Sequence, residues 1–139
     1  MDDQSIEHFV GTTWLIRKTI SAWIIPTGQS YSSTARWNGQ QIYGQNQMVF
    51  GFGNTHGISR GIINNEDKLW VYNWDGNDDR IGIDYEIGEL MHLELVHNGG
   101  ILYAYKNGIL VGQVNSNSTA DGGYIRKGGG TENGNVFNG

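Results

Sequence analysis

The chain of 139 residues contains no cysteine and a single proline. Without cysteine there are no disulfides and no thiolate metal sites, and the redox compartment stays open. Lysine and arginine together number 9, against 14 acidic residues, and they form no basic block. Because affinity for nucleic acid depends on clustered cations, we expect no nucleic-acid partner. No apolar run approaches the roughly 20 residues of a bilayer span, so membrane insertion is not expected either.

Glycine, asparagine and aromatic residues are abundant instead. The chain has 22 glycines, 5 tryptophans and 7 tyrosines. Turn-forming residues recur throughout and few segments show helical periodicity, which is typical of an all-β sandwich or barrel. The length suits one domain with a sizeable core, so we predict a single domain over residues 1–139. The acidic and polar residues 1–4 do not have the pattern of a secretory signal.

The clearest pattern lies in residues 92–114. Segments 93–95 and 101–105 place apolar side chains at every second position, which is the period of a half-buried strand. Asn98-Gly99 and Asn107-Gly108 fall at the two reversals, and the central residues of a type I′ turn need the positive φ that Gly and Asn tolerate. The sequence therefore predicts a three-stranded meander. The side chains expected in the sandwich core are Trp23, Leu93, Leu95, Leu102 or Tyr103, and Val111.

Other strands are expected around this meander, because short β-prone runs alternate with turn-forming residues. They are predicted at residues 5–10, 12–25, 48–53, 59–64, 68–74, 81–87 and 122–126. A turn is expected at residues 65–67. The polar residues 29–47 are expected to form a long loop or a loose hairpin.

Several of these segments together resemble a known family. Residues 90–112 form the meander with its Asn-Gly-Gly and Lys-Asn-Gly turns, and residues 19–26 are Thr-Ile-Ser-Ala-Trp-Ile-Ile-Pro. Residues 61–72 form a Gly-Ile…Lys-Leu-Trp-Val-Tyr hairpin, followed later by Tyr-Ile-Arg and Phe-Asn-Gly segments. This order resembles the laminin-G-like, concanavalin-A-like jelly rolls from residue 19 onwards. The resemblance implies a jelly-roll sandwich of two antiparallel sheets, and it is carried by core and turn positions.

Two features depart from the family pattern. Leu90 stands where the family often has tryptophan. Family members continue after Phe-x-Gly with a strand that begins Ile-Asp-Asp, whereas this sequence ends at Gly139 and begins Met-Asp-Asp-Gln-Ser-Ile. Circular permutation, strand exchange between subunits, or a chance match of a short acidic N-terminus would each explain the difference. We expect residues 1–9 to form a strand beside residues 135–139.

Catalysis is not expected. Glycoside hydrolysis needs two carboxyl groups flanking the scissile bond, and Asp84, Glu86 and Glu89 are the candidates. Their order is reversed relative to the family's glucanase motif, and Glu89 falls at a predicted turn. A solvated strand face and turn is therefore the preferred interpretation, and a glycoside hydrolase is a remote alternative.

One acidic loop could hold a metal ion. Asp75, Asn77, Asp78 and Asp79 gather hard oxygen ligands of the kind that calcium prefers. The same residues are common in ordinary turns, and the loop lacks the spacing of an EF-hand. Calcium is therefore a possible cofactor, and no other cofactor is indicated. The four histidines show no ligand spacing, and two of them are expected on or near strand surfaces, namely His92 and His97.

The aromatic residues suggest a binding surface. Trp70, Tyr72 and Trp74 share one face of a predicted strand, and the first two are expected in the core or at a subunit interface. Aromatic rings beside amide groups suit sugar stacking. The predicted ligand-binding residues are Trp37, Asn38, Tyr43 and Trp74.

Two functions from different classes follow. The first is a non-catalytic surface-recognition or adhesion module that binds glycan or a surface protein. The second is a structural assembly protein, such as a virion (phage capsid) decoration, fibre or knob component, and a homo-oligomer or larger assembly is expected. A virion surface or a cell-surface or extracellular location would suit both, and the fold alone does not choose between them.

Overall fold

The computed structural model describes residues 17–30, 36–37, 40–41, 47–52, 56–73, 81–116, 125–127, 137 and 139. Within these ranges the regular structure is all β, with no helix. The strands are β1 (Arg17–Ile24), β2 (Arg36–Trp37), β3 (Gln40–Gln41), β4 (Gln47–Phe52), β5 (His56–Ile63), β6 (Glu66–Asn73), β7 (Ile81–Ile83), β8 (Met91–Asn98), β9 (Ile101–Lys106), β10 (Ile109–Asn115) and β11 (Ile125–Lys127).

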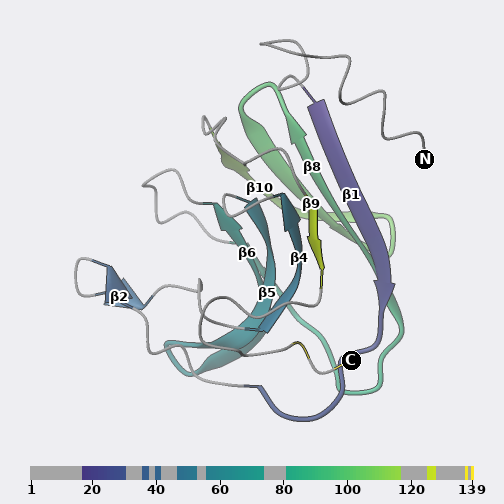
Figure 1. Cartoon of the computed structure of the whole chain (residues 1–139). Helices are drawn as coiled ribbons and strands as arrows, with labels where there is room; N and C mark the ends of the chain where they lie inside the picture. The colour runs from purple at the N-terminus through teal and green to yellow at the C-terminus, as the bar shows by residue number, and fades with distance from the viewer. Residues whose placement is uncertain are drawn as a thin grey trace.

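Two antiparallel sheets lie face to face (Figure 1). The four-stranded sheet has the order β1-β8-β9-β10, and the five-stranded sheet has the order β11-β4-β5-β6-β7. A separate two-stranded ladder joins β2 and β3, so the polar segment 29–47 does contain a short hairpin. The all-β, two-sheet prediction is therefore confirmed for the described residues.

Twelve buried apolar side chains form the core between the sheets. Leu93, Leu95 and Leu102 are among them and are completely buried, as expected. The expectation for Trp23 and Val111 is wrong, because both are exposed. On β1 the residues that alternate with Trp23 face inward instead and pack on this core, namely Ile20, Ala22 and Ile24.

The exposure of Val111 has a local cause. The register of β9 and β10 shifts between Leu110 and Gly112, which leaves Val111 as the extra residue of a β-bulge. Gly112 then returns to the core side, where a Cβ would meet the side chain of Ile81 at 3.2 Å.

One tight turn lies where the sequence predicts it, and two others are displaced by one residue. Asn107 and Gly108 both have positive φ and join β9 to β10, as predicted. Between β8 and β9 the two central residues are Gly99 and Gly100, because the strand continues through Asn98. Between β5 and β6 the turn is residues 64–65 rather than 65–67, because two asparagines there accept positive φ.

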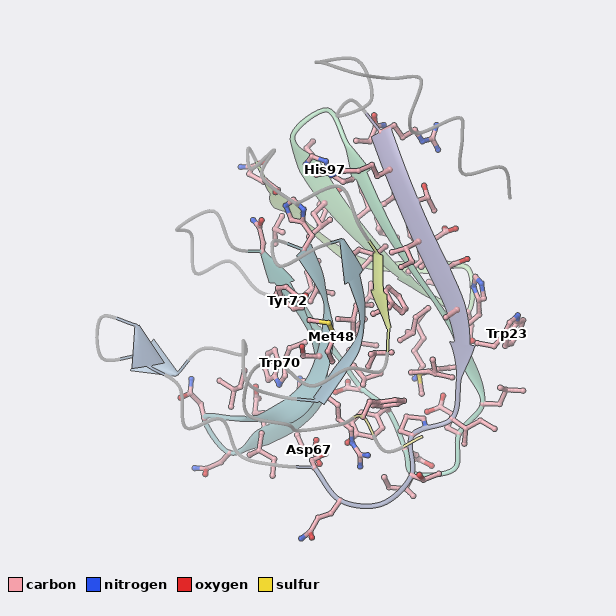
Figure 2. All side chains as sticks on the ribbon, in the orientation of Figure 1. Trp23, Met48, Asp67, Trp70, Tyr72 and His97 are labelled. Atoms are coloured by element: carbon pink, nitrogen blue, oxygen red, sulfur yellow. The ribbon has the colours of Figure 1, made fainter. Side chains whose placement is uncertain are left out.

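A second apolar cluster lies on the other face of the five-stranded sheet. Leu69 and Val71 of β6 belong to the main core, so the alternating residues Trp70 and Tyr72 face away from it. They are nevertheless buried, together with Met48 and Ile63 (Figure 2). Trp70 and Tyr72 are therefore buried, as expected, although in this second cluster rather than in the core between the sheets.

Several strand ends differ from the sequence expectation. β5 begins at His56 rather than at residue 59, β6 begins at Glu66 rather than at residue 68, and β7 stops at Ile83 rather than at residue 87. At the C-terminus, Gly139 lies against the carbonyl oxygen of Ile25, immediately after β1. The strands expected at residues 5–10 and 1–9 lie outside the described residues. The predicted strand near residue 122 is present as the shorter β11.

Candidate functional site

The outer face of the four-stranded sheet carries Trp23, the most exposed aromatic residue among those whose side chains the structure describes. Because side chains alternate along each strand, the residues that face away from the core on β1, β8 and β9 stand side by side. The register places Trp23 opposite His92, Ser21 opposite Glu94, and Glu94 opposite Tyr105. We call this surface the aromatic face, and it comprises Ser21, Trp23, His92, Glu94, Tyr103 and Tyr105.

Trp23 is the most prominent member of the aromatic face. Its side chain is 68% exposed and projects from the end of β1 away from the core (Figure 2). Its ring centroid lies 5.1 Å from that of His92, with a tilt of 57° between the planes. A tryptophan that exposed is unusual unless it contributes to an interaction. The tilted contact with His92 restrains one side of the ring and leaves the other side open.

Polar groups are available beside Trp23. Glu94, Tyr103 and Tyr105 are partly exposed. Within the described residues, the Glu94 carboxylate and the two tyrosine hydroxyls have no hydrogen-bond or ion-pair partner. The backbone beneath them is held firmly, because Asn107 donates its N–H to the carbonyl of His92 and accepts the N–H of His92 on its Oδ1. The aromatic face thus combines a rigid base with uncommitted donors and acceptors.

An apolar border adjoins the aromatic face at the start of β8. Ile24 pairs with Met91, so Ile25 and Leu90 continue the outer row beyond Trp23 and His92. The N–H of Gly88 donates to the carbonyl of Pro26, which brings the turn containing Ile87 to the same end. Ile25, Ile87 and Leu90 are all exposed, so this border is open to a contact with another molecule.

A buried polar cluster joins the two sheets at their other end. His56 Nε2 lies 2.5 Å from Ser116 Oγ, and Ser116 Oγ donates to Asn73 Oδ1 at 2.8 Å. His97 Nε2 lies 3.0 Å from the carbonyl oxygen of Ser116. Burial lowers the pKa of His97, and the positive charge of Lys18 lowers it further, while the hydrogen bond to Ser116 opposes both effects.

This cluster contains a serine and a histidine in contact, and yet its geometry does not suit nucleophilic catalysis. Ser116 and His56 are both completely buried, so no substrate reaches the hydroxyl in this structure. Its proton is directed to Asn73 rather than to the histidine. The sequence expectation that His97 lies near a surface is wrong, because the last core-facing position of β8 is covered by β5 and by Ser116.

A second buried polar network secures the segment after β1. Arg60 is 1% exposed, and its guanidinium donates to the carbonyls of Thr27 and Gly28 and, at 2.6 Å, to Tyr85 Oη. Tyr85 in turn donates to Asp67 Oδ1 at 2.9 Å. Burial raises the pKa of Tyr85, so its hydroxyl keeps its proton for that bond. The network fixes the chain immediately after the strand that carries Trp23.

The site residues predicted from sequence have different outcomes. The backbone of Trp37 lies in β2 and pairs with Gln40, and its side chain is not among those that the structure describes. The described residues contain no group of three metal-ligating side chains. The remaining predicted ligand-binding and calcium residues lie outside the described ranges, namely Asn38, Tyr43, Trp74, Asp75, Asn77, Asp78 and Asp79.

The three carboxylates weighed for glycoside hydrolysis lie after β7 rather than along a strand. Lys68 pairs with Asp84 at 3.4 Å, and Lys106 pairs with Glu89 at 3.0 Å. Glu89 Oε2 also accepts the backbone N–H of Glu86 across the turn. The hydrogen bond from Lys106 is the main cause that lowers the pKa of Glu89. Glu89 therefore stabilises a turn, as the preferred sequence interpretation expected, whereas the expected strand face is absent because β7 ends at Ile83.

Sequence patterns did not indicate the aromatic face directly, since Trp23 was expected in the core. The signal that could have found it is the alternation of residues 19–24, in which Ile20, Ala22 and Ile24 form a complete apolar row without Trp23. Comparison of the chain with models of protein families, with curated proteins and with solved structures finds no match. Among the described residues, no helix has the length and apolar character to cross a membrane.

Proposed function

We propose that this protein is a non-catalytic recognition module that binds carbohydrate on the aromatic face of its four-stranded sheet. The observation that carries the proposal is the exposure of Trp23 next to uncommitted polar groups. The two-sheet architecture suits the laminin-G-like, concanavalin-A-like jelly roll that the sequence resembles, and that resemblance supports a recognition role without specifying a ligand.

The chemistry of sugars explains why this surface suits them. A pyranose ring has an apolar C–H face that packs on an aromatic ring and a rim of hydroxyls that need hydrogen-bond partners. Trp23 supplies an open ring, and Tyr105 and Tyr103 follow along β9 on the same face, about 7 Å apart by strand geometry. Glu94 and Ser21 lie between these aromatic residues and offer acceptors and a donor.

A carbohydrate-binding experiment tests the proposal. The protein is screened on a glycan array and on insoluble polysaccharides, and the best ligand is then titrated calorimetrically. Trp23→Ala should weaken binding about five- to tenfold, since one stacking contact contributes about 1–1.5 kcal/mol. Ile109→Ala is the matched control, because Ile109 is also highly exposed but lies on β10 outside the aromatic face. Equal loss in both variants, or no binding of any carbohydrate, would refute the proposal.

A second candidate function is structural assembly, as in a virion decoration, fibre or knob component. The apolar border formed by Ile25, Ile87 and Leu90 favours it, because aliphatic side chains contribute more to protein contacts than to sugar contacts. Light scattering after size exclusion distinguishes the two functions. Leu90→Ser should dissociate an oligomer if the border mediates assembly, and it should leave the molar mass unchanged if the protein is monomeric.

A further inference from the structure

We infer that the aromatic face selects glycans that carry free, protonated amino groups, because the Glu94 carboxylate stands between the aromatic residues and the described part of the chain gives it no cationic partner. This inference rests on the proposed carbohydrate-binding function and specifies its ligand class. The ligand class would be amino sugars that are not N-acetylated, as single units or in a polymer.

The position of Glu94 is set by the sheet register. Ser21 lies directly opposite it on β1, and Tyr105 lies directly opposite it on β9. Trp23 is its diagonal neighbour, because Trp23 pairs with His92 two residues earlier on β8. A carboxylate between two aromatic residues attracts an ammonium group twice, through its own charge and through the electron-rich faces of the rings.

The Glu94 carboxylate is available for such a ligand. Its side chain is partly exposed, and no hydrogen bond or ion pair engages it within the described residues. This contrasts with the carboxylates of Asp84 and Glu89, which pair with Lys68 and Lys106. Partial burial strengthens the attraction that a bound cation would feel, because the surrounding side chains exclude part of the solvent.

The charge around Glu94 also excludes the opposite ligand class. The other charged group that the described strands place on this outer face is Arg17, which is four residues from Ser21 along β1, or about 13 Å by strand geometry. At that distance Arg17 neither neutralises Glu94 nor offers a nearby anion site. The whole chain carries a formal charge of −5. Uronic-acid and sulfated glycans are therefore disfavoured, and neutral glycans gain nothing from the charge.

The test compares two oligosaccharides of equal length, a glucosamine oligomer and its fully N-acetylated counterpart. Binding is measured by calorimetry at a pH at which the free amines are protonated. The wild-type protein should bind the glucosamine oligomer about tenfold more tightly, since a charge-assisted contact is worth about 1.5 kcal/mol or more. The preference should decrease as salt is added. Glu94→Gln should reduce it to about one while binding of the acetylated oligomer is retained.

Three control variants separate the possible explanations. Glu66→Gln removes the same charge from the start of β6, away from the aromatic face, and should keep the preference. Arg17→Gln removes the other charged side chain that β1, β8 and β9 place on the outer face and should keep it as well. Trp23→Ala should weaken both ligands. Thermal unfolding of each variant confirms that it is folded.

The possible results distinguish a failure of the inference from a failure of the proposed carbohydrate-binding function. If the wild-type protein binds both oligomers equally, or if the preference survives Glu94→Gln, the inference is overturned and carbohydrate binding stands. If the protein binds neither these oligomers nor any carbohydrate on the array, the proposed function is overturned together with the inference.

Discussion

The rings of His56 and His97 stack on each other across the two sheets, with centroids 4.8 Å apart and 23° between their planes. Each histidine forms a hydrogen bond with Ser116. The Ser116 hydroxyl donates its own proton to Asn73 Oδ1, so its oxygen accepts the proton of His56 Nε2. The backbone carbonyl of Ser116 accepts the proton of His97 Nε2. Both Nε2 protons are therefore donated in the neutral Nε2–H tautomer, whereas His97 Nδ1 has no hydrogen-bond partner among the described residues. A proton added to either ring would place a charge against the other ring inside the sandwich.

This arrangement predicts a loss of stability in acid. The pKa of His97 is lower in the folded protein than its ordinary value of 6.5. Its contribution to stability is therefore fully present above about pH 6.5 and is lost as the pH falls through the folded-state pKa. The free energy of unfolding, measured with urea between pH 7.5 and pH 4.5, should decrease through this range. His97→Gln should flatten the decrease, and an unchanged pH profile in that variant would contradict the role of His97.

Lys18 predicts an effect of the same sign on the alkaline side. It lies opposite His97 on β1, and burial lowers the pKa of its amine from 10.5 to about 8. The folded protein therefore becomes more stable as the pH rises from about 8 to 10.5, where the unfolded chain still binds the proton. Lys18→Met should stabilise the protein at pH 7, and the gain should shrink as the pH approaches 10.5. A gain that is independent of pH would show that packing rather than charge is responsible.

Truncation of an inward-facing side chain of the four-stranded sheet should lower the free energy of unfolding far more than truncation of an outward-facing one. Leu95→Ala removes a completely buried side chain from the core and should cost about 2–5 kcal/mol. Trp23→Ala removes a larger side chain from the outer face and should change stability by no more than about 0.5 kcal/mol. Chemical denaturation of both variants measures the difference. A large loss in Trp23→Ala would mean that the ring is covered in solution.

Arg60 predicts the cost of removing a buried anchor. Arg60→Leu leaves the carbonyls of Thr27 and Gly28 and the hydroxyl of Tyr85 without their donor. Hydrogen bonds from a charged group contribute about 1.5–3 kcal/mol, so the variant, which loses the bonds of a completely buried guanidinium, should lose about 3 kcal/mol. Arg60→Lys should recover only part of this loss, because an ammonium group cannot reproduce the planar fork. Full recovery by lysine would show that charge alone, rather than the geometry, matters.

Local chemistry made much of the fold predictable. The Asn107-Gly108 turn could be placed from the sequence because positive φ excludes most other residues there. The shift of the preceding turn to Gly99 and Gly100 was less predictable, because three successive residues of the Asn-Gly-Gly run tolerate that backbone. The choice among them depends on how far the ladder between β8 and β9 extends.

The candidate site was much less predictable. The loop aromatics Trp37 and Tyr43 attracted attention because long polar loops often carry function. Trp23 did not, because it lies in an apolar strand and tryptophan is expected inside. The buried polar cluster was equally hidden, since His56 and Ser116 are 60 residues apart and meet only because two sheets close on each other.

The sequence by itself determined the local conformation of this protein, namely where the chain extends and where it reverses, because these depend on side chains and backbone angles a few residues apart. The tertiary structure decided which side of each strand is buried. An alternating pattern is compatible with either face, and on β1 both parities offer apolar residues. Only the packing of the second sheet against Ile20, Ala22 and Ile24 turns Trp23 outward and creates the aromatic face.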